Sequence, residues 1–421
     1  MCILKIVLIY AIVSLNNVYL VSSRIQLKQP EEIKVERIPN GPPCILDINK
    51  DLADPQPLHL HPGSTVFWPV RDKGHLEIPR GESVELQCTK GFRLKPTDKS
   101  INATCSEDKS FLVNNEKVPF QLLNCTSPVR YTVREANSTC ADNARLYEIG
   151  FDVTSNRFIK TISVCHDKSR VNTLWTFNKL EPANVHFQKS VQRLNFSKAG
   201  YFEKRNMNRL YSKENQKQVF ENLLGSNYVK FFNNRTQFLS RGHISPKADH
   251  IYGSQQRATF NFFNAAPQWQ IFNAGTWSAV ENGIRRLVAS KNTELDCYSG
   301  TWGVISLPNS KGEPREIYLA TDANNNGEIP VPKLFYKLIV DTRSTPQKGV
   351  VLIGVNNPYV TMEELKEDYL ICNDVSEWVP WIRWKRDNIA KGYFFACRVD
   401  DFIRVVDELP KSLKNVHELL V

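Results

Sequence analysis

Apolar runs long enough to cross a membrane are lacking in this chain of 421 residues. One apolar stretch follows Lys5 and spans residues 6–15, which is too short for a bilayer-spanning helix. A basic residue, a short apolar stretch and then small residues at 21–23 are typical of a secretory signal peptide. The sequence therefore predicts a signal peptide at residues 1–23 and a secreted, extracellular mature protein that does not enter the membrane.

Cysteine pairs with the Cys-x-x-Cys spacing are also lacking, which argues against a zinc site. Ten cysteines are present, and in an exported protein they predict disulfide bonds. Cys2 leaves with the signal peptide, so an odd number remains, which predicts one free thiol or an intermolecular bridge. The remaining cysteines are Cys44, Cys88, Cys105, Cys125, Cys140, Cys165, Cys297, Cys372 and Cys397.

Sequons for N-glycosylation agree with an exported protein. The Asn-x-Ser/Thr pattern marks an acceptor that must lie on exposed chain. It predicts glycosylation at Asn102, Asn124, Asn137, Asn195 and Asn234.

Acidic residues are fewer than basic ones, with 44 Asp and Glu against 54 Lys and Arg. The formal net charge is +10 and the pI is about 9.0. Such an excess in an extracellular protein favours binding to the phosphates of nucleic acids, although basic surfaces also arise without function. No segment resembles a helix that reads bases in the major groove, so the expected binding is independent of base sequence.

Internal repeats and a regular alternation of strands with helices are lacking as well. Residues 24–130 contain short strand-like runs, turns and four cysteines, which predict a small β-rich domain held by disulfides. From residue 131 to 421 strand-like and helix-like runs are interspersed. This pattern favours an α+β fold with an antiparallel sheet.

The side chains best suited to phosphate and metal chemistry are concentrated between positions 240 and 287. Residues 258–264 alternate between two faces, which predicts a strand that ends in Asn264 and is stopped by Pro267. Farther along, four residues recur at steps of four, which predicts one stripe along a helix. These are Asn273, Trp277, Glu281 and Arg285.

Each of these residues also has an ordinary structural explanation. Asn273 is a residue type favoured at a helix N-cap. Glu281 and Arg285 have the spacing of an i,i+4 ion pair on a solvated helix face. A site for chemistry is favoured only because carboxamides, a carboxylate, arginines and an Arg-Gly-His sequence converge if the strand and the helix pack together.

The segment resembles the DNA/RNA non-specific endonuclease family. The family's Asp-Arg-Gly-His corresponds to Ser-Arg-Gly-His at 240–243, and its Asn-x-x-Pro-Gln to 264–268. Its Asn-x-Gly-x-Trp-x-x-x-Glu-x-x-x-Arg corresponds to 273–285. The sequence around these motifs is most similar to the secreted arthropod branch of the family. That branch includes salivary nucleases and gut nucleases that degrade double-stranded RNA. The resemblance implies a ββα-metal nuclease domain over 131–421, with a central antiparallel sheet flanked by helices.

Phosphodiester cleavage needs an activated water, neutralised charge at phosphorus and help for the leaving oxygen. His243 is the predicted general base, because a neutral imidazole accepts a proton from water. Asn273 is the predicted ligand of Mg²⁺ or Mn²⁺, and Glu281 is expected to orient the water shell of the ion. Asn264 is expected to anchor that water network or a phosphate oxygen. The resemblance implies the same roles.

Basic residues near these positions are expected to bind the substrate. Arg241 and Arg285 are predicted to clamp the phosphate, because guanidinium binds it with two hydrogen bonds. The resemblance also implies an upstream arginine, for which Arg193 is the candidate. Lys247 and Arg257 add positive charge beside the site.

One position departs from the family signature, because Ser240 stands where many members carry Asp. Loss of that carboxylate is expected to loosen the water shell of the metal. The predicted function is a secreted, magnesium-dependent endonuclease for single- and double-stranded DNA and RNA, whose products carry 5′-phosphates as the resemblance implies. The alternative, favoured by Ser240, is a nucleic-acid-binding protein with weak or no catalysis. A third possibility, a disulfide-rich interaction protein, requires every motif match to be accidental.

Overall fold

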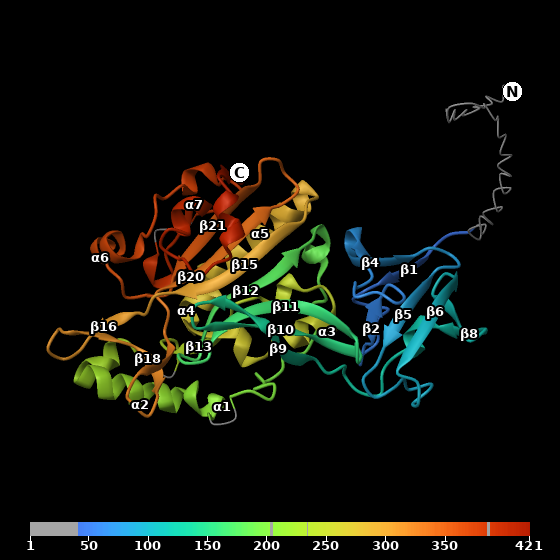
Figure 1. Ribbon diagram of the computed structural model, residues 1–421, viewed down its shortest axis with the longest axis horizontal. Coiled ribbons are helices and arrows are strands. Elements are labelled where there is room, and N and C mark those ends of the chain that lie inside the picture. The colour runs from blue at the N-terminus through green and yellow to red at the C-terminus, as the bar shows by residue number, and fades with distance from the viewer. Residues whose placement is uncertain (1–40, 203–204, 234, 385–387) are drawn as a thin grey trace, which may run out of the picture. The chain divides into compact units, whose positions relative to one another are not determined.

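A computed structural model describes residues 41–421 apart from 203–204, 234 and 385–387 (Figure 1). The predicted signal peptide and the predicted glycosylation site at Asn234 lie outside the described residues. Sheets dominate the described part and helices are interspersed among them, which confirms the predicted α+β class.

A nine-stranded sheet forms the centre of the described chain, in the order β22-β21-β20-β15-β12-β11-β10-β9, with β23 beside β21. All its pairs are antiparallel except β21 with β23. The antiparallel sheet predicted from the sequence is therefore confirmed. Its strands are β9 (Thr132–Ala141), β10 (Ala144–Thr154), β11 (Arg157–Asp167), β12 (Asn172–Leu180), β15 (Leu295–Trp302), β20 (Leu334–Asp341), β21 (Lys348–Val355), β22 (Phe394–Cys397) and β23 (Glu418–Leu419).

The two faces of this sheet pack against different helices. On β20, Ile339 joins the core that contains helix α5 (Ser278–Lys291), whereas Leu338 joins the core that contains α7 (Val399–Phe402). Successive strand residues point to opposite faces, so Lys337 points to the same side as Ile339. A fully buried lysine among apolar neighbours needs an anionic partner, because an unpaired buried charge is costly.

Residues 44–125 form two small antiparallel sheets, in the orders β1-β4-β3 and β2-β5-β6-β7-β8. The disulfide Cys44–Cys105 joins β1 of the first sheet to β6 of the second, and Cys88–Cys125 joins the residue after β5 to the end of this region. A disulfide-bonded β-rich N-terminal region is therefore present, while a domain boundary at residue 130 stays a prediction. The strands are β1 (Cys44–Asp47), β2 (Leu58–Leu60), β3 (Val70–Arg71), β4 (His75–Ile78), β5 (Ser83–Gln87), β6 (Ser100–Glu107), β7 (Ser110–Val113) and β8 (Glu116–Pro119).

Shorter elements complete the described chain. Two further disulfides, Cys140–Cys165 and Cys372–Cys397, lie within residues 131–421. Cys297 is a free, buried thiol, which is the first of the two outcomes predicted from the odd cysteine count. The elements are α1 (Met207–Leu210), α2 (Lys213–Leu224), α3 (Gly253–Ala258), α4 (Gln270–Phe272), α6 (Met362–Glu364), β13 (Leu239–His243), β14 (Ala265–Trp269), β16 (Ser306–Pro308), β17 (Pro314–Glu316), β18 (Tyr318–Thr321) and β19 (Gly327–Pro330).

His59 is packed between the N-terminal region and the segment that precedes α3. Its ring stacks on Tyr252 at 5.2 Å and on Phe120 at 5.9 Å. Only 1% of the residue is exposed, and neither ring nitrogen has a hydrogen-bond partner among the described residues. Burial therefore lowers the pKa of His59 to about 3.

This histidine predicts a loss of stability in mild acid. Below a pH of about 6.5 the unfolded chain binds a proton on His59 that the folded chain does not accept until its lower pKa is reached. Stability is thus complete above that pH and falls as the pH decreases. At pH 5 the loss is roughly 2 kcal/mol for one such histidine.

Urea unfolding at pH 7.5 and 5.0 measures this effect in the wild type and in His59→Phe. We expect the variant to lose about 2 kcal/mol less than the wild type between the two pH values. His417→Phe, at an exposed position, is the control and should behave as the wild type does. Equal losses in all three proteins would rule out His59 as a source of acid sensitivity.

Candidate active site

Strands β13 and β14 form a two-stranded antiparallel sheet that carries the first two motifs. Ser240 lies opposite Gln268, and His243 lies opposite Ala265. Gly242 is needed between them, because a Cβ there would lie 2.4 Å from Oε1 of Gln268. With α4 and α5 following β14, the order is strand, strand, helix, as predicted.

The strand predicted at 258–264 is wrong. Helix α3 ends at Ala258, Phe262–Asn264 form a 3-10 turn, and β14 begins only at Ala265. The apolar residues of 258–264 are buried at both even and odd positions, so their alternation does not mark two faces of a strand. Pro267 does not stop the strand but lies within it, which is tolerated because β14 is paired on one side only.

The predicted helical stripe is interrupted at Gly275. Residues 273–277 form a π-helical turn, and Gly275 has non-helical angles of φ −96° and ψ −121°. Helix α5 begins only at Ser278, and Trp277 is buried in the core. Asn273 therefore belongs to the turn before α5 and does not lie on one straight helix face with Glu281.

The side chain of Asn273 reaches across to β13. Its Nδ2 donates to Oγ of Ser240 at 3.0 Å, and that hydroxyl donates to the carbonyl of Gln268 at 2.9 Å. The alternative of an N-cap is wrong, since α5 has no side-chain cap hydrogen bond. Oδ1 of Asn273 accepts no hydrogen bond from the described residues, which leaves this oxygen available for a ligand.

A pocket of about 480 Å³ lies at this junction. Asn273, Ser240 and Arg241 line it together with Arg193. The sequence thus predicted three of its polar lining residues as site residues, and Ser240 as the departure from the signature. Two aromatic rings that were not predicted, Phe196 and Phe260, also line it.

His243 packs against these two rings. Its ring centroid is 4.9 Å from that of Phe196 and 4.8 Å from that of Phe260. Nε2 is buried and has no partner among the described residues, whereas Nδ1 is not buried in this way. Burial, followed by the charges of Arg193, His250 and Lys247, lowers the pKa of His243 to about 3. The imidazole is therefore neutral at physiological pH.

The side-chain amide of Asn264 is fully used in hydrogen bonds to backbone groups. Its Oδ1 accepts from the amide of Ser245 at 2.8 Å, and its Nδ2 donates to the carbonyls of Ser245 and Thr259 at 2.9 and 3.0 Å. The residue is fully buried. These contacts hold the chain that follows β13, and they leave no amide group for the water or phosphate that the sequence suggested.

Two predicted substrate-binding cations are also engaged. Lys247 donates to the carbonyl of Val191 at 2.6 Å, and Arg257 is buried and pairs with Asp54 at 2.8 Å. Neither residue lines the pocket that contains Asn273.

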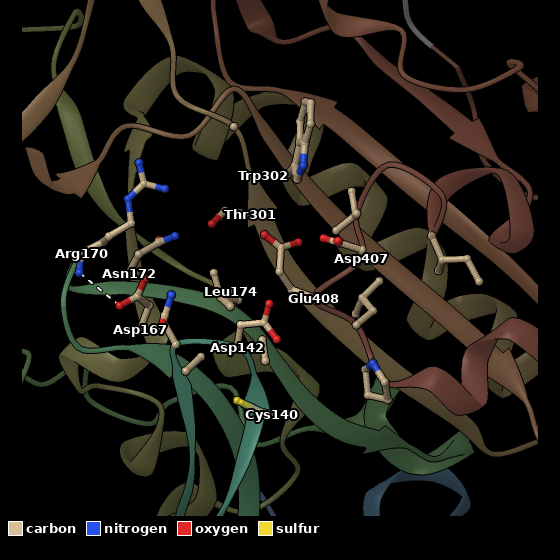
Figure 2. Close-up of a pocket in the computed structure, with 18 of the residues that line it drawn as sticks. Cys140, Asp142, Asp167, Arg170, Asn172, Leu174, Thr301, Trp302, Asp407 and Glu408 are labelled. Carbon is tan, nitrogen blue, oxygen red and sulfur yellow. Dashed lines mark hydrogen bonds between the residues drawn. The ribbon is translucent and has the colours of Figure 1, made fainter.

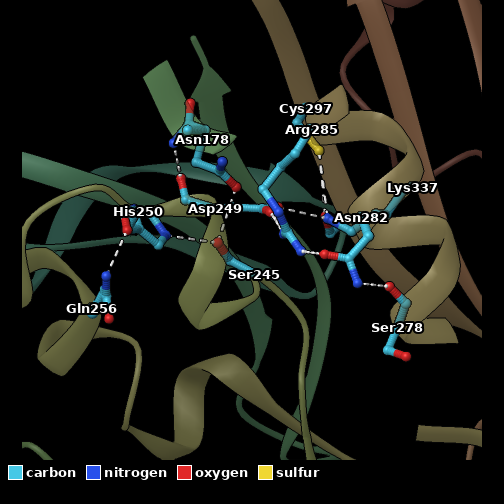
Figure 3. Close-up of polar contacts among 12 residues, drawn as sticks. Asn178, Ser245, Asp249, His250, Gln256, Ser278, Asn282, Arg285, Cys297 and Lys337 are labelled. Atoms are coloured by element: carbon cyan, nitrogen blue, oxygen red, sulfur yellow. Dashed lines mark hydrogen bonds and ion pairs between the residues drawn. The ribbon is translucent and has the colours of Figure 1, made fainter. Parts of the chain in front are cut away.

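The phosphate clamp predicted for Arg285 is wrong. Arg285 is 4% exposed, forms an ion pair with Asp249 and donates to Asn282 at 2.8 Å (Figure 3). The other oxygen of Asp249 pairs with Lys337 at 3.0 Å. A buried guanidinium neutralised by a carboxylate does not face a substrate, so Arg285 holds α5 against the central sheet. The alternative ion pair of Arg285 with Glu281 is not present either.

Burial and neighbouring charges shift the pKa of the carboxyl groups in and near this network. Burial alone would raise the pKa of Asp249, but Lys337 and Arg285 outweigh it and leave the value lowered. Burial raises the pKa of Glu281 to about 7, against the attraction of Lys337. Glu281 does not line the pocket with Asn273. The sequence missed Asp249 and Lys337, although a lone lysine in the apolar run 334–340 was a signal for a buried partner.

The neighbourhood of Asn273 suits a hard cation that keeps most of its waters. Among the residues that the structure describes, no cluster of three or more His, Cys, Asp and Glu side chains is able to hold a metal. The side-chain oxygens at the pocket are neutral and belong to Ser240, Asn273, Asn195 and Gln270. Mg²⁺ binds such sites through one or two protein oxygens, whereas zinc and calcium need more protein ligands.

A larger cavity of about 710 Å³ lies elsewhere, between β12, β15 and residues 403–414. Figure 2 shows Asp142, Asp407 and Glu408 around it, with Arg170 on another side. None of the predicted site residues lines this cavity. The smaller pocket is the better candidate for phosphodiester chemistry, because Asn273 and two arginines line it and His243 packs against two of its lining rings.

Three of the predicted glycosylation sites are exposed: Asn102, Asn137 and Asn195. Asn124 is half-buried. Asn195 lies at the pocket that contains Asn273. Across the described ranges, no helix has the length and apolar character needed to cross a membrane.

Comparison with known proteins agrees with this geometry. Residues 142–402 match the DNA/RNA non-specific endonuclease family. The chain is 27% identical to a salivary endonuclease of Lutzomyia longipalpis over 388 residues, which cover 89% of this chain and 87% of that protein. It is 25% identical to salivary protein Tsal2A of Glossina morsitans morsitans, covering 80% and 83%. Salivary protein Tsal1 of the same organism is 22% identical, covering 95% and 96%.

The buried network predicts a strong dependence of stability on Asp249. Asp249→Asn leaves Arg285 and Lys337 buried without their carboxylate, which should cost about 3–5 kcal/mol in urea unfolding. Glu313→Gln breaks an exposed pair with Arg315 and should cost less than about 1 kcal/mol. Similar costs for the two variants would contradict a structural role for Asp249.

Proposed function

Because this chain belongs to the DNA/RNA non-specific endonuclease family, we propose that it is a secreted endonuclease that uses Mg²⁺ or Mn²⁺ to hydrolyse DNA and RNA. The observation that carries the proposal is one pocket in which the free oxygen of Asn273 lies with Arg193 and Arg241, while His243 packs on two of the pocket's walls. In this proposal the base, the metal ligand and the phosphate-binding cations come from three separate segments of the chain.

His243 serves as the general base in this proposal. A neutral imidazole with a proton on Nε2 has Nδ1 available to accept a proton from the attacking water. The low pKa of His243 keeps it neutral throughout the physiological range. The unsatisfied Nε2 is costly in a buried setting, and such cost is typical of functional sites.

Asn273 would hold the metal ion through Oδ1, because its Nδ2 is fixed by Ser240. A bound Mg²⁺ neutralises phosphate charge and lowers the pKa of a coordinated water. Arg193 and Arg241 bind the phosphate, and Asp249, Arg285 and Lys337 position α5 and the turn before it. Glu281 as the residue that orients metal-bound water stays a prediction.

The substrate is proposed to be single- or double-stranded nucleic acid of either sugar type, cut to give 5′-phosphates. A net charge of +10 supports binding through phosphates, which both nucleic acids share. The signal-like N-terminus and exposed sequons support an extracellular glycoprotein.

Ser240 supports a second candidate, a nucleic-acid-binding protein with weak or no catalysis. Its hydroxyl carries no charge, so it contributes less to cation binding than a carboxylate at that position. In this alternative the pocket binds phosphate through its arginines, and the metal is bound poorly.

Cleavage of plasmid DNA and double-stranded RNA, with Mg²⁺ or with chelator, separates the two candidates. We expect Mg²⁺-dependent fragmentation that falls by about 10²–10⁴-fold in His243→Ala. His417→Ala, at an exposed position, is the matched control and should retain full activity. Thermal unfolding and binding in chelator verify that His243→Ala is folded. Gel shifts without cleavage by the wild type would favour the binding protein.

Ser240→Asp tests the departure from the family signature. The carboxylate still accepts from Asn273 and adds a negative charge beside the ion, so the Mg²⁺ concentration for half-maximal cleavage should fall by roughly tenfold. Ser240→Asn, of similar size without charge, should show no such fall. An unchanged Mg²⁺ requirement in Ser240→Asp would show that residue 240 does not act on the metal.

A further inference from the structure

A second pocket adjoins the one that contains Asn273. It has a volume of about 620 Å³ and is lined by residues 127–133, by Lys90 and Arg257, and by part of the segment 194–199. Leu194 and Asn195 line both pockets. The two pockets are therefore contiguous along this segment.

Tyr131 connects the two pockets through a shared wall. Its ring lines the second pocket, and its hydroxyl donates to the carbonyl of Phe260 at 2.9 Å. The ring of Phe260 lines the first pocket and contacts His243. The hydrogen bond thus ties a lining residue of the second pocket to the residue whose ring contacts the proposed base.

Lys90 and Arg130 supply positive charge to the second pocket. Both are exposed, and neither forms an ion pair with any residue that the structure describes. The amide of Arg130 donates to Oγ1 of Thr89 at 3.0 Å, which holds the two cations on neighbouring segments. Arg257 adds no comparable charge, because Asp54 neutralises it.

Apolar side chains accompany these cations. Val129 and Tyr131 are half-buried at the pocket, and Leu194 is 39% exposed, which is unusual for a leucine. Apolar and aromatic surface next to exposed cations is the chemistry that binds a nucleotide, since the base packs on the surface and the phosphate pairs with the cation.

We propose that the second pocket binds a nucleotide of the substrate strand that lies beyond the two nucleotides flanking the cleaved phosphodiester, with Lys90 and Arg130 as its phosphate contacts. The proposal rests on the nuclease function proposed above. It gives the β-rich N-terminal region, through Lys90, a direct part in substrate binding. Binding there lengthens the contact with the strand without reading its bases.

The double variant Lys90→Ala/Arg130→Ala tests this proposal. We expect its Kd for a labelled 20-nucleotide single strand in chelator to rise roughly tenfold, and the slope of log Kd against log salt to fall by about two. With Mg²⁺, KM for the long strand should rise while kcat and the cleavage of a dinucleotide stay unchanged.

A matched control removes the same charge elsewhere. Lys311→Ala/Lys348→Ala alters two exposed lysines that do not line either pocket, and it should leave both Kd and the salt slope near those of the wild type. The measurements are repeated in Asn195→Gln, because a glycan at this predicted acceptor would stand where the pockets meet.

Each result decides one question. If both double variants bind and cleave alike, the second pocket is not a substrate site, even when the wild type is an active nuclease. If the wild type does not cleave but Lys90→Ala/Arg130→Ala still weakens binding selectively, the nuclease proposal fails and the binding site stands. Equal loss with the dinucleotide and the long strand would overturn the proposal, since it would show a general effect on the active site.

Discussion

A buried carboxylate, Asp249, connects the helix of the ββα unit to the central sheet. It pairs with Arg285 on α5 and with Lys337 on β20, and all three side chains are within the core. Two cations require this anion, because charge without a partner is strongly disfavoured at such depth. The location of α5, and with it the turn that carries Asn273, therefore depends on one ion-pair network.

The same segment is fixed on its other side by neutral hydrogen bonds. His250 follows Asp249, and its Nε2 lies 3.1 Å from Oγ of Ser245, whose backbone is held by Asn264. The chain after β13 is thus held by side-chain hydrogen bonds within a few residues of His243. The buried Nε2 of His243 has no partner among the described residues, and the same holds for Nε of Arg241 and the side-chain amide of Gln268 on the same two strands. Unsatisfied polar groups held in place by well-bonded neighbours are the arrangement expected of a preorganised site.

Local pattern predicted much of this site, because the motif residues lie close together in sequence. The motif spacing pointed to His243, Asn273 and Arg241, the family resemblance suggested Arg193, and the lack of a βαβ rhythm indicated the antiparallel sheet. The strand at 258–264 was misjudged, since alternation carries no information where both faces are buried.

Arg285 was misjudged for a different reason. Its partner Asp249 lies 36 residues earlier in the chain, and Asp249 lies 88 residues before Lys337. No local window contains such pairings. Propensity and spacing describe what one segment is able to do, whereas the partner of a buried charge is decided by how distant segments pack.

The unpaired Cys297 lies on β15, within 3.8 Å of Lys337 and 3.6 Å of Ser299. Burial raises the pKa of its thiol more than the neighbouring ammonium lowers it, so the reactive thiolate is scarce. In an oxidising compartment, a lone sulfhydryl invites mixed adducts with glutathione and scrambling of established bridges. Because Cys297 is buried in the core beneath α5, neither reaction reaches it in the folded protein. The rate at which the thiol is alkylated therefore reports how often this part of the core opens to solvent.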